Sequence, residues 1–166
     1  MEELVFWTCA AVSVASALLV VTRRNPIYSA FFLIVGFLAI AASIVPLSAV
    51  FLAGMHVLVY TGAIMVLFVF VIMLLNLGPG ELGNEYPATF RIFVALLCAA
   101  LFGLTAFAVQ GENFGEPVRA SADFGGIRAA GEFLFGAYVF PFEVISLLIL
   151  VAVFGAVMLA RRKETE

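Results

Sequence analysis

The chain has 166 residues, of which 65% are hydrophobic and 11% charged, and its mean hydropathy is +1.21. A soluble domain has about 45–50% apolar and 25% charged residues, so this composition predicts an integral membrane protein and excludes a soluble domain with its own core. The net charge of −3 and the lack of a long basic run argue against nucleic acid as a partner. We therefore expect a single membrane domain in contact with the lipid bilayer.

Two apolar runs, at residues 4–21 and 27–45, predict the first two spans. The acidic start of the first run argues against a cleaved secretory signal, which needs a positive head. Arg23 and Arg24 separate the two runs, because a pair of arginines does not sit in hydrocarbon. Pro26 follows them and suits the first turn of the second helix.

The third apolar run, at residues 50–77, is the longest and carries no formal charge. About 20 residues suffice to cross a bilayer core of about 30 Å, so this run exceeds one straight crossing. Its second half has no polar face, which is typical of a helix in lipid or inside an apolar bundle. Its first part differs, because His56 and Tyr60 stand four residues apart on one helical face and Gly62 follows them.

Two further spans are predicted at residues 90–109 and 138–160, which makes the chain an all-α protein with five transmembrane helices. Between them, the polar residues 110–132 predict a partly ordered extramembrane loop that packs on a neighbour. Cys9 and Cys98 lie inside apolar runs, where a free thiol behaves as a small hydrophobic group. We interpret both cysteines as packing residues.

Five spans place the two termini on opposite sides of the membrane. Most of the basic residues fall on one side of this arrangement, and only Arg119 and Arg128 fall on the other. Cytoplasmic loops are enriched in lysine and arginine, so the N-terminus is predicted outside and the C-terminus in the cytoplasm. The basic residues on the predicted cytoplasmic side are Arg23, Arg24, Arg91, Arg161, Arg162 and Lys163.

His56 is the first of the candidate functional residues. Ionisable groups within a span are costly and commonly mark proton or ion routes. Histidine also gains and loses protons near neutral pH, which suits a proton path. The alternative is that His56 lies near the membrane interface and forms a hydrogen bond with a neighbouring helix.

The segment Tyr60, Thr61, Gly62 and Ala63 is the second candidate. Its helix is weakly held, because glycine costs about 1 kcal/mol relative to alanine in a helix interior. A π-bulge or kink here is one hypothesis, and such bulges are frequent at functional sites. The other is that Gly62 lets another helix come close. The residues alone leave both open.

Glu143 is the third candidate and follows Pro141 at the start of the fifth span. If Pro141 is the first helical residue, Glu143 is the third, where the helix dipole and free N–H groups favour a carboxylate. A proton relay and an ion pair with a cation on another subunit are the alternatives. The sequence has no phosphate loop, cysteine cluster, histidine pair or nucleophile with an adjacent base, so no catalytic, metal-binding or cofactor-binding residue is predicted.

Three stretches resemble subunit J of the proton-pumping NADH:quinone oxidoreductase, respiratory complex I, a family that includes the sixth mitochondrially encoded NADH dehydrogenase subunit. The most specific is residues 59–77 (VYTGAIMVLFVFVIMLLNL). The others are residues 24–30 (RNPIYSA) and residues 142–146 (FEVIS), which run on to residues 159–162 (LARR). The resemblance covers all five spans in order.

The resemblance implies a non-catalytic membrane-arm subunit in a bacterial inner membrane. It implies that flavin, iron–sulfur clusters, nicotinamide and quinone are bound by other subunits. The implied partners are the membrane-arm subunits A, K and H, the last of which forms the quinone site, together with the antiporter-like subunits.

The resemblance also implies a role for the third helix as a switch. A π-bulge, here at Tyr60 to Ala63, relaxes to a regular helix and so makes or breaks a hydrated path from the quinone cavity to the pumps. His56 stands where many members of the family carry glutamate or glutamine.

Two alternatives remain at this point. One is the homologous subunit of a cation/proton antiporter complex or of a membrane-bound hydrogenase, which lacks neighbouring genes for a nicotinamide-oxidising arm. The other is a small structural or transport protein that acts alone and is stable and functional without partners.

Overall fold

Helices form the regular structure of the residues that the computed structural model describes, which are 1–75, 87–111 and 124–161. The elements are, in chain order, α1 (Glu2–Thr22), α2 (Pro26–Ile44), the 3-10 helix η1 (Val45–Leu47), α3 (Val50–His56), the π-helix η2 (Val57–Ile64), α4 (Met65–Leu75), α5 (Ala88–Gly111), α6 (Ile127–Phe135) and α7 (Val139–Ala160). α3, η2 and α4 follow one another directly and form one long helix.

Five helical stretches of the described residues are long and apolar enough to cross a membrane. This confirms the predicted all-α fold with five spans. The predicted end of the third span, at residues 76–77, lies outside the described residues. The five stretches are Glu3–Thr22, Pro26–Leu47, Val50–Leu75, Ile92–Gln110 and Val139–Ala160.

The tightest packing is between α1 and α2. Small residues of α2 are buried there, and a Cβ atom added at Gly36 would lie 3.4 Å from Cβ of Ser16, which is itself buried. The turn that joins the two helices is also well held, since the Asn25 side chain accepts a hydrogen bond from the Ile27 N–H and the Ser29 hydroxyl donates to the Val20 carbonyl. α2 is therefore firmly attached to α1.

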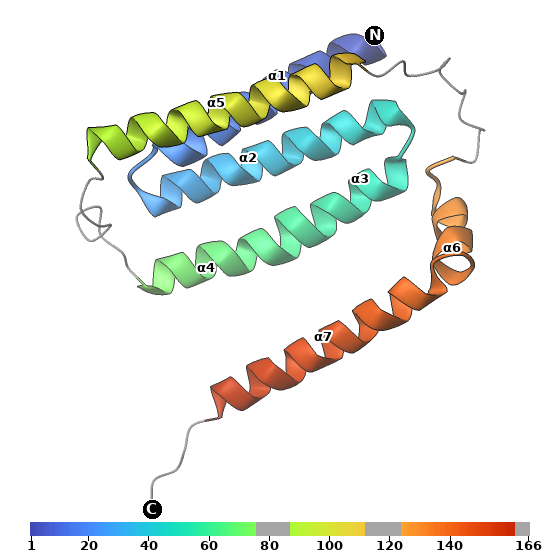
Figure 1. Ribbon diagram of the computed structural model, residues 1–166. Coiled ribbons are helices and arrows are strands. Elements are labelled where there is room, and N and C mark those ends of the chain that lie inside the picture. The colour runs from blue at the N-terminus through green and yellow to red at the C-terminus, as the bar shows by residue number, and fades with distance from the viewer. Residues whose placement is uncertain (76–86, 112–123, 162–166) are drawn as a thin grey trace, which may run out of the picture.

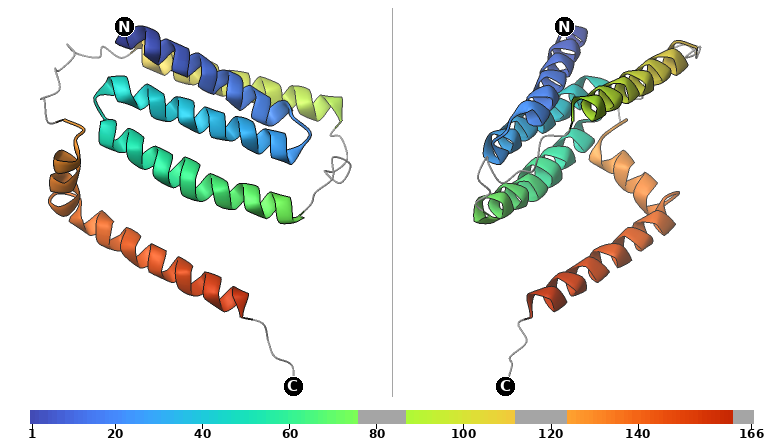
Figure 2. Two further views of the ribbon diagram at one scale, coloured as in Figure 1. Left: turned by 180° about the vertical axis from the view of Figure 1, so that it is seen from behind. Right: turned by 60° about the vertical axis from the view of Figure 1, so that its left-hand side comes forward.

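α2 lies between α1 and the long helix formed by α3, η2 and α4 (Figures 1 and 2). On the long helix, Ala53 of α3 and Met65 of α4 are buried and lie on either side of η2. α1, α2 and the long helix thus form one layer with α2 in the middle, and η2 contacts α2.

α5 and α7 contribute little to this layer. No residue of the most apolar window of either span is buried. α7 lies apart from the α1–α4 layer in all three views, and α5, which overlaps α1 in Figure 1, diverges from it in the right-hand view of Figure 2. Their apolar side chains are therefore available to lipid or to other proteins.

The α2–α3 turn is held to the segment before α6 by a backbone hydrogen bond, in which Phe51 N–H donates to Gly125 O over 3.1 Å. Gly125 has φ +75°, and a Cβ atom there would collide with Ser48 O and lie 2.7 Å from Ala49 Cα. Only glycine meets both conditions without strain.

The structure differs from the predicted extramembrane loop at residues 110–132 at both ends, because α5 runs to Gly111 and α6 begins at Ile127. Apolar and charged residues of α6 fall on opposite sides of the helix, and Arg128 Nε lies 3.1 Å from Glu132 Oε1 one turn away. A helix of this kind is favoured at a boundary between apolar and polar surroundings. Residues 112–123 of the predicted loop lie outside the described residues.

The spans alternate in direction. In Figure 1 the start of α1, the α2–α3 turn, the end of α5 and the start of α7 share one end of the molecule. Arg23 follows α1 and Arg161 follows α7, so both arginines lie at the opposite end.

Candidate functional site

The π-helix η2 is the most unusual element of the described chain. It covers eight residues, Val57–Ile64, and the Met65 N–H bonds to Tyr60 O five residues earlier. The predicted π-bulge at Tyr60 to Ala63 is therefore confirmed, and the observed segment is longer on both sides. Most π-helical segments are single turns inside α-helices, frequently at functional sites.

Three rings meet beside η2, and we call them the aromatic triad: Phe37 of α2, His56 of α3 and Tyr60 of η2. The His56 and Tyr60 rings are stacked, with centroids 4.7 Å apart and planes 18° from parallel. Phe37 lies 5.7 Å from each of them, at 74° to the imidazole and 58° to the phenol ring. Both tilted arrangements are favourable for aromatic pairs. The triad thus joins α2 to the start of the π-helix.

Two polar atoms at the same place are buried without a hydrogen-bond partner among the described residues: His56 Nδ1 and Thr61 Oγ1. Several other hydroxyls in the spans donate to a backbone carbonyl three or four residues earlier, as Thr105 does to Leu101 O and Phe102 O. Buried polar groups in proteins are nearly always hydrogen-bonded. Water or another protein would supply the missing partner of each atom.

These observations bear on the two hypotheses for His56. Its imidazole makes ring contacts within the chain, and the expected hydrogen bond to a neighbouring helix is not observed among the described residues. The role of His56 in a proton path stays a prediction.

Gly62 and Ala63 lie on the exposed side of η2. A Cβ atom added at Gly62 would have Val57 O at 3.4 Å as its one neighbour within 4 Å among the described residues. The close approach of another helix to Gly62 is therefore not observed within this chain. Tyr60 is 48% exposed, so this side of the site is accessible to lipid, water or another protein.

The expectation for Glu143 is wrong in one respect. α7 begins at Val139, so Pro141 is the third helical residue and Glu143 the fifth, beyond the first turn. The first helical hydrogen bond runs from Phe142 N–H to Tyr138 O, so Pro141 lies in the first turn, where a proline needs no N–H donor. Glu143 is exposed, and α7 lies apart from η2 in Figure 1. The structure does not bring Glu143 together with His56 or Tyr60.

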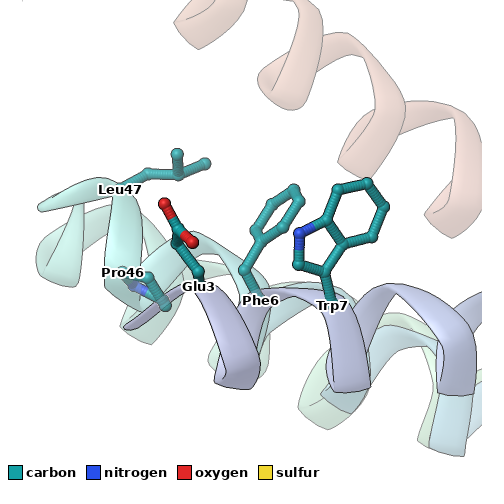
Figure 3. Close-up of a pocket in the computed structure, with 5 residues that line it drawn as sticks. All are labelled: Glu3, Phe6, Trp7, Pro46 and Leu47. Carbon is teal, nitrogen blue, oxygen red and sulfur yellow. The ribbon is translucent and has the colours of Figure 1, made fainter. Parts of the chain in front are cut away.

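A surface pocket of about 360 Å³ lies elsewhere, where the start of α1 meets η1. Its lining side chains are Glu3, Phe6, Trp7, Pro46 and Leu47, and Figure 3 shows the Phe6 and Trp7 rings side by side next to the Glu3 carboxylate. None of the candidate residues of the third and fifth spans belongs to it.

The chemistry available at η2 is narrow. It consists of an imidazole, a phenol and a hydroxyl, which can donate, accept or relay protons. Among the described residues, no group of three histidine, cysteine or acidic side chains could hold a metal ion. These groups are suited to hydrogen bonding and to the relay of protons.

Phe37 is the member of the site that the sequence did not identify. It lies in an apolar run among many other phenylalanines, and the sequence contains 18 of them. No local pattern distinguishes it, because its importance comes from the packing of α2 against the third span.

The chain is similar to known proteins over nearly its whole length. The model of the family described as NADH-ubiquinone/plastoquinone oxidoreductase chain 6 matches residues 16–159. NADH-quinone oxidoreductase subunit J of Escherichia coli strain K12 is 35% identical, covering 98% of this chain and 88% of the relative. The subunit J of Pseudomonas aeruginosa is 35% identical, covering 96% and 97%. NADH-quinone oxidoreductase subunit 10 of Thermus thermophilus is 38% identical, covering 91% and 88%.

Proposed function

The chain belongs to the NADH-ubiquinone/plastoquinone oxidoreductase chain 6 family, and from this we propose that it is a membrane-arm subunit of a proton-translocating NADH:quinone oxidoreductase. Its own role is to couple quinone reduction to proton transfer through the third span. It carries out no bond-making chemistry itself.

The observation that carries this proposal is the combination of full-length similarity with the π-helix in the third span. Relatives named as subunits of NADH-quinone oxidoreductase align along almost the entire chain, so the likeness is not confined to one helix. The π-helix lies in the most specific of the stretches that suggested this family, residues 59–77. A helix segment with two geometries of similar energy is a physical means of coupling two processes.

The partners proposed for this chain are other membrane-arm subunits, namely A, K, H and the antiporter-like subunits. The exposed apolar surfaces of α5 and α7 support a role within a larger assembly, since few apolar side chains of the described residues are buried. Flavin, iron–sulfur clusters and quinone belong to partner subunits in this proposal.

The proposed location is a bacterial inner membrane, with the N-terminus outside and the C-terminus in the cytoplasm. The support for this orientation is the placement of Arg23 and Arg161 at the same end of the bundle. Positive residues favour the cytoplasmic side.

A deletion tests the proposal. In inverted membrane vesicles from the source organism, removal of this chain should abolish proton pumping driven by NADH and quinone, and a plasmid-borne copy should restore it. Pumping that persists at the original rate would refute the proposed role. Loss of a sodium/proton exchange activity, with NADH-driven pumping intact, would instead identify an antiporter subunit.

A further inference from the structure

A π-helix of eight residues requires something to hold it. π-helical geometry is rare, and the α-helical alternative is available to any segment within a longer helix. The sequence of η2 offers no proline or inserted side-chain bond that would force the wider geometry. The cause therefore lies in contacts between η2 and the rest of the protein.

Two positions flanking η2 are fixed by burial. Ala53 is 5% exposed and Met65 is 2% exposed, so α3 and α4 are each seated against α2. A π-turn contains about one residue more than an α-turn. A change from π to α geometry therefore rotates the helix on one side of η2 relative to the helix on the other side by about 100° and shifts it by about 1.5 Å. The change would therefore move at least one of these two buried positions relative to α2.

The aromatic triad lies at the point where the rotation begins. His56 is the last residue of α3, and Tyr60 is the fourth residue of η2. Their stacked rings therefore connect the α-helical frame to the π-helical one. A rotation between these two frames would break the near-parallel overlap.

Phe37 connects this stacked pair to a fixed support. It follows Gly36, the position at which α2 makes its close contact with Ser16 of α1. Phe37 is half-buried and contacts both members of the stack. α2 thus holds the Phe37 ring in place, and the contacts of this ring restrict the positions of the His56 and Tyr60 rings.

We infer that Phe37 is a positioning residue that stabilises the π-helical form of η2, by holding the stacked His56 and Tyr60 rings against α2. The inference deepens the coupling role proposed above and rests on that role only for its effect on proton pumping. The geometry of η2 itself is a separate readout.

The test is structure determination of the assembled complex by electron cryo-microscopy with Phe37→Leu, which keeps an apolar side chain of similar size but removes the ring. The ratio of particles with a π-helical to an α-helical η2 should fall about tenfold, because the loss of one to two aromatic pairs corresponds to about one power of ten in an equilibrium constant. Phe37→Tyr keeps the ring and should leave the ratio unchanged.

Phe31→Leu is the matched control. Phe31 lies on the same helix, is 59% exposed and pairs only with Phe32 among the ring contacts of the described residues. It should not alter η2. An unchanged ratio in Phe37→Leu, or an equal change in Phe31→Leu, would overturn the inference.

The outcomes also separate the inference from the proposed function. A shifted ratio with undiminished proton pumping would support the role of Phe37 and count against coupling through η2. An unshifted ratio, together with lost pumping in a Gly62 variant, would refute the role of Phe37 and leave the proposed function standing.

Discussion

The imidazole of His56 and the phenol ring of Tyr60 stack 4.7 Å apart across the junction between α3 and the π-helix η2. The contact links two helix geometries within one continuous span. It also gives the His56 imidazole a packing role that does not depend on proton transfer.

Replacing His56 tests which property is used. His56→Phe keeps a ring for stacking and removes the buried Nδ1 that has no partner among the described residues, so it should retain most NADH-driven proton pumping. His56→Gln keeps a polar side chain without a ring and should lose more. Pumping rates of both variants across pH 6–8 measure this. If Gln outperforms Phe, or if Phe alone alters the pH profile, proton transfer at His56 is supported instead.

Gly62→Leu should reduce coupled proton pumping more than it reduces assembly. A Cβ atom at Gly62 would already lie 3.4 Å from Val57 O across the π-turn, so a branched side chain restricts rearrangement of this segment. Pumping per assembled complex is the measurement. Gly54→Leu is the control on the same span, since a Cβ atom at Gly54 would meet nothing within 4 Å. Equal losses of assembly and pumping would indicate a packing role alone.

Thr61→Val should weaken the assembled complex. The buried Thr61 hydroxyl has no partner among the described residues, and buried hydroxyls nearly always have one, so its partner is expected from water or a neighbouring subunit. Loss of one such bond costs about 1 kcal/mol. Thr105→Val removes a hydroxyl that bonds only to its own helix and should have little effect. Retention of this chain after detergent challenge gives the comparison, and a Thr61→Val complex as robust as the parent would contradict it.

The length and apolarity of the five runs sufficed to predict the spans, because crossing a bilayer demands both. For Tyr60 to Ala63, the residues left a π-bulge and the close approach of another helix both open, because Gly62 weakens the α-helix in either case, and only the family resemblance implied the bulge. Phe37 and Gly125 were not foreseeable. Phe37 matters through its contact with a ring on another helix. Gly125 matters through its positive φ and its close contact with Ser48. Neither property leaves a local sequence pattern.

Gly125→Ala tests the link between the α2–α3 turn and the segment that leads to α6. Alanine would be strained at φ +75° and would collide with Ser48 O, so we expect a loss of more than about 2 kcal/mol in stability. The thermal midpoint of the complex should fall. Gly131→Ala in α6 meets no atom within 4 Å and should leave the midpoint unchanged or slightly higher. Similar midpoints for the two variants would show that the segment is not held in this way in the complex.

The direction in which the chain crosses the membrane follows from its arginines. Arg23 and Arg161 lie at one end of the bundle, and the end of α5 lies at the other. Because positive residues are retained in the cytoplasm, green fluorescent protein fused after Glu166 should fluoresce, whereas alkaline phosphatase fused after Gly111 should be active outside. The two reporters exchanged between these sites are the control, and each should then be silent. The reverse pattern would place Arg23 and Arg161 outside and would show that partner subunits, rather than the charges of this chain, determine its orientation.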